Sequence, residues 1–285
     1  MTNLKIQPGE FETLKKYIYD VSGIALASGK EYLVETRLKP LIAEYDCRSY
    51  QEIYTKAKAD IKKIIERKII DSISTNETYF FRDKAPFDLL QYKIIPDLID
   101  IKTKKNGGLK PNIRIWSSAS STGQEIYSVS MILNELNIKH PTYNVKLLAT
   151  DISDAAISQA SRGLYNKFEV TRGLSKEKLD KYFVPDSEQW KIADQLRATV
   201  TFKQMNLMKP FVGLGKFDII FCRNVAIYFT AENRARLFER LADTLENDGY
   251  LIIGSTESLT GESTIFEPKR YLNSTFYQKK NTRIV

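Results

Sequence analysis

Histidine, cysteine and long apolar runs are scarce in this sequence, and each shortage excludes a class of protein. His140 is its one histidine, and Cys47 and Cys222 have no CxxC or CxxH spacing. We therefore expect no zinc site, no other metal centre and no Ser-His-Asp relay. No run approaches the roughly 18 uncharged apolar residues of a membrane helix, and the initial MTNLKIQPGEF has no apolar signal core. We expect a cytoplasmic protein that does not insert into a membrane.

Acidic residues are in the minority, and their distribution is uneven. The chain has 43 basic and 35 acidic residues, a formal net charge of +8. Residues 1–80 are nearly balanced, with 13 basic and 12 acidic residues, so almost all of the net charge lies beyond residue 80. Such a charge attracts acidic partners at long range, but it does not choose among nucleic acid, an anionic membrane and an acidic protein surface.

Residues 1–73 are predicted to form a small all-α domain. Apolar residues recur there at helical spacing, and short polar breaks separate the helices. We predict a first helix from Pro8 that ends at Ser22-Gly23, and further helices at 32–45, 50–59 and 61–73. Pro40 is expected to kink or split the second helix.

Residues 91–285 are predicted to form a doubly wound α/β domain, which a linker at 74–90 joins to the first domain. Short, nearly continuous apolar strands such as FDIIF and YLIIG are typical of a parallel sheet covered on both faces. We interpret the irregular residues 163–198 as a small inserted subdomain with a β-hairpin formed by 182–184 and 190–192. The remaining predicted elements are a helix at 87–102, a loop at 104–111, strands at 113–117, 145–150, 199–204, 217–222 and 249–254, helices at 124–137, 153–161 and 231–246, and an antiparallel edge strand at 270–279.

The segment 112–128, NIRIWSSASSTGQEIYS, has the pattern of a buried strand, a turn of small side chains and the start of a helix. Cofactors bind at such turns, beyond the carboxyl ends of the strands and against the free N–H groups of the helix. The turn around Ala119 contains one glycine, so a GxGxxG fingerprint is missing. Glu125 would repel the phosphates of a dinucleotide and could hold an ammonium group, which favours S-adenosylmethionine over NAD. A plain polar turn is the alternative.

Polar residues also follow the next strands. Asp151 stands where an acidic side chain accepts hydrogen bonds from ribose hydroxyls, and the alternative is a helix N-cap. Asn206 and Leu207 could read an adenine edge and cover its face, or could belong to an ordinary loop. Arg223 and Asn224 directly follow a fully apolar strand and are expected to face the cleft, although Arg223 could instead form a salt bridge that supports the loop.

The linker carries a further set of candidates. In STNETYFFRD (74–83) the polar residues Asn76, Thr78 and Arg82 alternate with aromatic ones, whereas ordinary linkers are rarely so aromatic. The segment can pack on the sheet domain and offer polar groups to the cleft. Arg82 is the most informative, because a guanidinium binds a carboxylate through two parallel hydrogen bonds.

Five segments together resemble the chemotaxis receptor methyltransferases of the CheR type. They are TNETYFFR (75–82), IRIWSSASSTGQEIYS (113–128), ATDIS (149–153), FDIIFCRNVAIYF (217–229) and YLIIGSTESL (250–259). The resemblance spans nearly the whole chain and implies a Rossmann-like S-adenosylmethionine-dependent methyltransferase domain, with S-adenosylhomocysteine as the product. It implies a protein-glutamate O-methyltransferase that acts on the cytoplasmic helical bundle of chemoreceptors and sets receptor adaptation.

The resemblance also implies the site residues. Arg82 and Tyr228 match the family positions that face the methyl group and the incoming carboxylate, and they are the predicted catalytic residues. A glutamate carboxylate with a pKa of about 4.3 is already ionised near neutral pH, so the reaction needs no histidine base. The predicted cofactor-binding residues are Asn76, Thr78, Arg82, Ala119, Glu125, Asp151, Asn206, Leu207, Arg223 and Asn224.

Two departures from the family pattern qualify this expectation. Gln124-Glu125-Ile126 stands where the family usually has Glu-Glu-Pro, but the second glutamate is kept. Residues 184–194 lack the glycine-containing loop of enzymes that dock on a receptor's C-terminal peptide, so we do not expect tethering to such a peptide. Arg37, Lys39 and the stretch 56–68, with six basic and two acidic residues, are candidates for receptor contact, or form a solvated charged face. We expect a monomer.

Two other functions compete with this prediction. A nucleic-acid methyltransferase commonly has an Asp/Asn-Pro-Pro-aromatic motif after the fourth strand, whereas Arg223-Asn224-Val225-Ala226 stands there, so no nucleic-acid partner is expected. A catalytically idle S-adenosylmethionine-binding signalling protein is the second, and the presence of Arg82 and Tyr228 disfavours it.

Overall fold

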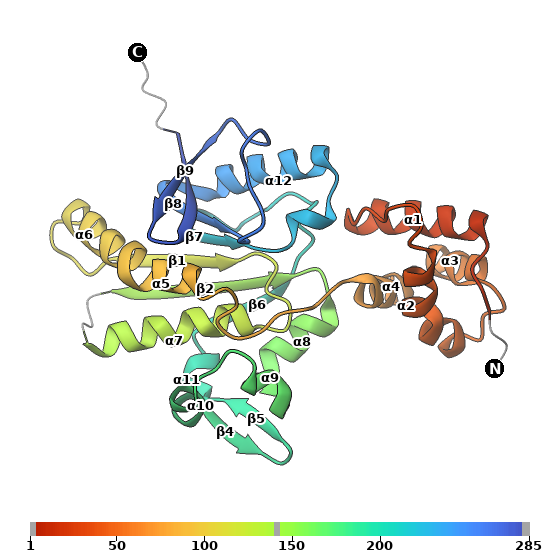
Figure 1. Cartoon of the computed structure of the whole chain (residues 1–285), viewed down its shortest axis with the longest axis horizontal. Coiled ribbons are helices and arrows are strands. Elements are labelled where there is room, and N and C mark those ends of the chain that lie inside the picture. Colours follow the sequence, from red (N-terminus) through yellow and green to blue (C-terminus); the bar gives the residue numbers. More distant parts are fainter. Residues whose placement is uncertain (1–3, 140–142, 281–285) are drawn as a thin grey trace.

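The structure is a computed structural model that describes residues 4–139 and 143–280. A group of helices from the start of the chain lies beside a larger sheet-containing part (Figure 1). His140, the one histidine of the chain, lies outside the described residues.

The N-terminal helices are α1 (Pro8–Ser22), α2 (Glu31–Glu44), α3 (Tyr50–Ala59) and α4 (Ile64–Ile73). Helix α1 ends because Gly23 takes φ +80° and its N–H donates to the carbonyl of Tyr19. Helix α4 begins three residues later than predicted, because the Asp60 carboxylate accepts from the N–H groups of Lys62 and Ile65 and forms a turn there. Helix α2 continues through Pro40, so the predicted split does not occur.

The helix predicted at 87–102 extends further at both ends and contains a π-helical turn. Its parts are α5 (Ala85–Leu89), the π turn η1 (Leu90–Ile94) and α6 (Ile95–Lys105). Pro96 has no N–H and its ring crowds the carbonyl four residues earlier. The widened turn, in which the N–H of Ile95 donates to the carbonyl of Leu90, accommodates the proline without a break.

The main sheet has the strand order β6-β2-β1-β7-β8-β10-β9. The first five of these strands are parallel, and β10 is antiparallel to both neighbours. The predicted single edge strand at 270–279 is wrong: the tail is a hairpin in which β10 pairs with β8 and β9 forms the edge. The strands are β1 (Asn112–Ser117), β2 (Asn144–Asp151), β6 (Val200–Gln204), β7 (Phe217–Cys222), β8 (Leu245–Ile253), β9 (Phe266–Tyr271) and β10 (Ser274–Lys279).

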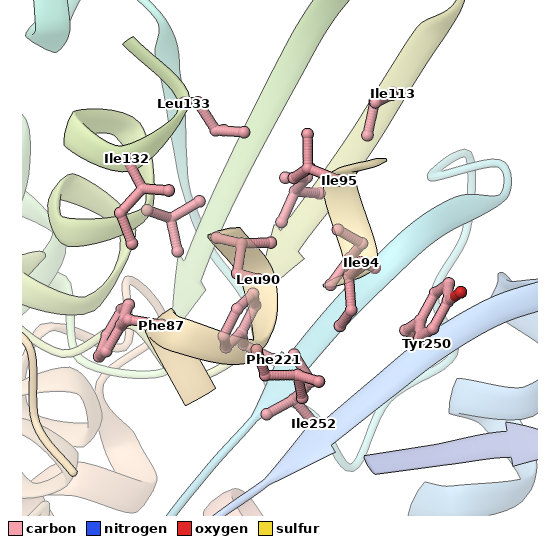
Figure 2. Close-up of a cluster of buried hydrophobic side chains, with 14 of the residues drawn as sticks. Phe87, Leu90, Ile94, Ile95, Ile113, Ile132, Leu133, Phe221, Tyr250 and Ile252 are labelled. Carbon is pink, nitrogen blue, oxygen red and sulfur yellow. The ribbon is translucent and has the colours of Figure 1, made fainter. Parts of the chain in front are cut away.

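Helices cover both faces of this sheet, as the apolar strands predict. Alternate residues of β7 divide between two cores: Ile219 and Phe221 face one, Ile220 and Cys222 the other. The first core packs under α5, η1, α6 and α7 (Gln124–Lys139), and Figure 2 shows Phe87 and Leu90 close to Phe221 and Ile252. The second packs under α12 (Ala231–Thr244). Each such buried side chain contributes about 1.5–3 kcal/mol to folding.

The segment between β2 and β6 starts with α8 (Asp154–Arg162) and then forms a separate small sheet. Strand β3 (Leu164–Tyr165) pairs with β5 (Gln189–Ile192), which pairs with β4 (Phe183–Asp186), so the predicted hairpin is present with a third strand added. The short helices α9 (Lys167–Thr171), α10 (Lys176–Tyr182) and α11 (Asp194–Arg197) flank it. We call residues 163–198 the inserted subdomain; its core also contains Phe80 of the linker.

Candidate functional site

A cavity lies beyond the carboxyl ends of β1, β2, β6 and β7, where the strand order reverses around β1. The linker and the end of α1 close its other sides. It holds about 940 Å³ of empty space, part of it open to solvent. All of the predicted site residues border it: Asn76, Thr78, Arg82, Ala119, Glu125, Asp151, Asn206, Leu207, Arg223, Asn224 and Tyr228.

The turn between β1 and α7 forms the floor of the cavity. Backbone hydrogen bonds fix it to both neighbouring strands: the N–H of Ser118 donates to Phe221 O and that of Ser120 to Thr150 O, each at 2.8 Å. Gly123 has φ +95°, and a Cβ there would lie 2.9 Å from the Cβ of Ala160, so glycine is required. The small side chains thus leave the space above the turn open.

Asp151, at the end of β2, is held by backbone donors. Its carboxylate accepts from the N–H of Ser121 at 2.8 Å and from that of Ser153 at 3.0 Å. The alternative, that residues 151–153 form a helix N-cap, is confirmed at Ser153, which is the N-cap of α8 because its hydroxyl accepts from Ala156 N, while Asp151 itself borders the cavity. Burial raises the pKa of the Asp151 carboxyl, and the backbone hydrogen bonds partly oppose this.

Arg223 connects the two sides of the cavity. Its Nη1 lies 2.8 Å from Glu125 Oε2, and its Nη2 lies 2.9 Å from Asp83 Oδ2 and donates to the carbonyl of Arg82. The other Glu125 oxygen accepts from the hydroxyl of Ser117 at 2.8 Å. The alternative interpretation of Arg223, a salt bridge that supports its loop, is therefore confirmed, and the same side chain borders the cavity.

The linker crosses the mouth of the cavity in a bent conformation. Phe81 and Asp83 have φ +54° and +63°, and the N–H of Phe81 donates to the Ser128 hydroxyl at 2.9 Å. The Ser121 hydroxyl donates to the carbonyl of Asn76. The guanidinium of Arg82 donates to the carbonyl of Glu77 at 2.9 Å, so the predicted carboxylate-binding group is oriented by its own linker.

Asn206 and Tyr228 join the cavity to the N-terminal helices. The amide of Asn206 donates to the carbonyl of Val21 at 2.8 Å, and its oxygen accepts from Met208 N. The carbonyl of Tyr228 accepts from Ala25 N at 2.8 Å. Each end of that amide has one protein partner in these contacts and keeps a second N–H or a second lone pair, so the reading of an adenine edge by Asn206 stays a prediction.

Sequence reasoning missed two contributions to the cavity. Ser22, Ile24 and Ile73 of the helical part border it, and nothing in their local pattern indicates this. The second is Glu257, whose Oε2 accepts from the N–H groups of Asn224 and Gly254, each at 2.7 Å. A signal for Glu257 was present, since it lies in the turn that follows the apolar run YLII (250–253).

The cavity fits S-adenosylmethionine. A nucleoside with an amino-acid tail needs acceptors for ribose hydroxyls and for an ammonium group, and the carboxylates of Asp151 and Glu125 both border the cavity. The Ser118 hydroxyl also borders it, is buried and has no hydrogen-bond partner, so it is available to a ligand. The cavity does not suit a ligand with several phosphates, because the carboxylates of Glu125 and Asp151 border it and would repel them.

Two kinds of feature are not found among the described residues. Across residues 4–139 and 143–280, no cluster of three His, Cys, Asp or Glu side chains is arranged to hold a metal ion. Within the same ranges, no helix has both the length and the apolar character that crossing a membrane requires.

Known proteins resemble this chain along nearly its whole length. Residues 9–71 match the family model "CheR methyltransferase, all-alpha domain", and residues 76–273 match "CheR methyltransferase, SAM binding domain". Chemotaxis protein methyltransferase Cher2 of Pseudomonas putida is 34% identical over 275 residues, which cover 95% of this chain and 98% of that protein. The chemotaxis protein methyltransferase of Vibrio parahaemolyticus is 35% identical over 283 residues, 98% of this chain and 100% of that protein. With both its parts matched, the chain belongs to the CheR methyltransferase family and is an S-adenosylmethionine-dependent methyltransferase.

Proposed function

We propose that this protein methylates glutamate side chains on the cytoplasmic helical bundle of chemoreceptors, to give glutamyl methyl esters that set receptor adaptation. The observation that carries the proposal is the position of Arg82 and Tyr228 on the same cavity as Asp151 and Glu125. The names of the relatives, chemotaxis protein methyltransferases, support the pathway.

The residues present suit a carboxylate substrate. A glutamate side chain is ionised near neutral pH, so it attacks without a general base, and the described residues that border the cavity include no histidine or cysteine. The bound cofactor supplies an electrophilic methyl group. The task left to the protein is to place the carboxylate and exclude water, which lowers the barrier by several kcal/mol.

Arg82 and Tyr228 have the chemistry for this placement. The guanidinium of Arg82 presents parallel donors to a carboxylate, and its bond to the Glu77 carbonyl leaves other N–H groups free for a ligand. Tyr228 borders the same cavity. We assign the carboxylate to these two residues, the ribose to Asp151 and the cofactor's ammonium group to Glu125, whose carboxylate is also bonded to Arg223 and Ser117.

Receptor contact is assigned to the exposed lysines of the helical part. Arg37 is not free for this role, because its guanidinium donates to the carbonyls of Ile73 and Ser74 and to the hydroxyl of Thr75. Lys39 and Lys62 are exposed. The β4–β5 hairpin closes through Ser187 and Glu188 without glycine, which supports recognition that does not use a receptor's C-terminal peptide.

Transfer of labelled methyl groups tests the proposal. The protein, the labelled cofactor and receptor-rich membranes are incubated, and base-labile methyl esters are counted on the receptor. We expect esters with the wild-type protein and a loss of at least about 100-fold with Arg82→Ala, since misplacement of a reacting group costs that much. Cofactor binding without ester formation by the wild-type protein would instead support an idle binding protein.

A further inference from the structure

The linker residues that orient Arg82 are also held by the inserted subdomain. Arg172, directly after α9, places its guanidinium over the ring of Tyr79, 4.3 Å from the ring centroid, and its Nη2 lies 2.9 Å from Glu77 Oε1. The guanidinium of Arg82 lies 5.8 Å from the centroid of the same ring and donates to the carbonyl of the same Glu77. Two arginines therefore share both partners.

The backbone on each side of this cluster is fixed by close packing. A Cβ at Gly173 would lie 1.9 Å from the carbonyl oxygen of Phe80, and Gly173 has φ +91°, so the linker and the subdomain touch there through their backbones. Phe80 is fully buried in the subdomain core, with its ring edge-on to those of Tyr165 and Phe183 at 5.1 and 5.5 Å. The linker consequently cannot shift without movement of the subdomain.

The charges in the cluster favour the observed arrangement. The Arg172 guanidinium holds the pKa of the Glu77 carboxyl below its usual value. Without Arg172, the Glu77 side chain would lose its ion-pair partner and the Tyr79 ring would lose its nearest cation. Of the two arginines that contact Glu77 and Tyr79, Arg82 alone would then remain. Its guanidinium could turn toward the Glu77 carboxylate and away from the cavity.

We infer that Arg172 is a positioning residue: by holding Glu77 and Tyr79, it keeps the Arg82 guanidinium directed to the substrate carboxylate. The inserted subdomain is in this way a structural part of the substrate site, although Arg172 does not border the cavity. The inference depends on the proposed role of Arg82.

Arg172→Ala, Arg172→Lys, Arg82→Ala and the double variant test this in the full-length protein. We expect Arg172→Ala to lower kcat for receptor methylation about 10-fold, with the Kd for S-adenosylmethionine changed less than about twofold. Arg172→Lys should recover part of the loss, because lysine keeps the ion pair but not the planar stacking. Lys176→Ala is the matched control, since Lys176 is an exposed cation of the same subdomain, and its kcat should be unchanged.

The double variant separates positioning from general stability. If Arg172 acts through Arg82, Arg82→Ala/Arg172→Ala is as slow as Arg82→Ala alone, whereas independent effects would multiply and would overturn the inference. An unchanged kcat in Arg172→Ala also overturns it and leaves the proposed function intact. If Arg82→Ala itself methylates at the wild-type rate, the assigned role of Arg82 fails and the inference fails with it. Should Arg172→Ala fail to fold, Arg172→Gln, which removes the charge paired with the Glu77 carboxylate but keeps a polar side chain, must lower kcat, and an unchanged kcat in that variant overturns the inference.

Discussion

Single carboxylates organise the cavity, and each is held differently. Asp151 is fixed by backbone N–H groups, Glu125 by Arg223 and Ser117, and Glu257 by the backbone of two strand ends. Asp151 and Glu257 have no cationic partner in these contacts. Mutation of either one should therefore leave no cation without its partner.

The raised pKa of Asp151 predicts a pH dependence of cofactor binding. Because burial raises the folded-state pKa above its ordinary value, the ionised form lowers the stability of the ligand-free protein, and this cost appears as pH rises through that pKa. Ribose hydroxyls donate to the ionised carboxylate. The affinity for S-adenosylmethionine should therefore fall as pH decreases through the pKa of Asp151, whereas the stability of the ligand-free protein should rise. Calorimetric titration with S-adenosylmethionine at a series of pH values from about 4 upward measures the affinity, and thermal unfolding of the ligand-free protein over the same series measures the stability.

Asp151→Asn provides the control for this pH dependence. Loss of hydrogen bonds to a charged acceptor costs about 1.5–3 kcal/mol, so its Kd should rise roughly 10-fold or more at neutral pH. Its Kd should also vary less with pH than that of the wild type. The same pH profile in both proteins would show that another group titrates.

Glu257→Ala should lower stability and weaken cofactor binding together. The change removes the acceptor of two N–H groups at the ends of β7 and β8, at a cost of about 1–3 kcal/mol. Asn224, which has φ +56° and borders the cavity, would lose the bond that fixes its backbone. Thermal unfolding and cofactor titration measure the two effects. Thr256→Ala, an exposed neighbour in the same turn, should change neither.

The observed helices and strands differ from the predicted ones at places where the local sequence pattern does not specify the structure. The π turn before Pro96 follows from local chemistry, but a helix pattern alone does not distinguish it from a kink. The hairpin of β9 and β10 was predicted as one strand, because the polar residues of β9 face outward and leave little apolar signal. In both cases the prediction of helix or strand was correct. The π turn inside the helix and the pairing of the strand were not predicted.

Gly23 offers a test at the scale of one element. Its left-handed φ ends α1, and a Cβ there would lie 2.3 Å from Cγ of Met208, in the loop that borders the cavity. Gly23→Ala should destabilise the protein by about 1–2 kcal/mol and also raise the Kd for the cofactor. Gly9→Ala, at the other end of α1 and with no atom near the added Cβ, is the matched control and should be neutral in both measurements. A neutral Gly23→Ala would show that the end of α1 does not constrain the site.

At the scale of the whole molecule, the helical part and the sheet part share one cavity. The bonds from Asn206 to Val21 and from Ala25 to Tyr228 join them at its edge. Residues of the helical part, Ser22, Ile24 and Ile73, therefore border the same cavity as the strand ends, and the proposed receptor contact through its exposed lysines would lie in the same part of the chain.

Charge reversal tests this receptor contact. Lys39→Glu and Lys62→Glu should weaken binding to receptor-rich membranes, and the difference from wild type should shrink as salt is added, because exposed charges are screened within about 10 Å at 0.1 M salt. Lys104→Glu, an exposed lysine of the sheet part, is the control. Equal loss in all three variants would indicate a solvated charged face that acts only through net charge.

The sequence alone determined most of the elements, the parallel sheet and the residues at the strand ends, since apolar periodicity and strand-end chemistry are local properties. It predicted Asp151 and Arg223 at one cavity because parallel strands end at the same edge of a sheet, Glu125 because it begins the helix after the first strand, and Arg82 from the alternation of polar and aromatic residues in the linker. Only the tertiary structure decided the partners of these side chains: that Arg223 pairs with both Glu125 and Asp83, that Asn206 is bonded to α1, and that Arg172 shares its contacts with Arg82. These contacts join residues far apart in the chain, and no local pattern specifies which distant groups will lie within hydrogen-bond distance.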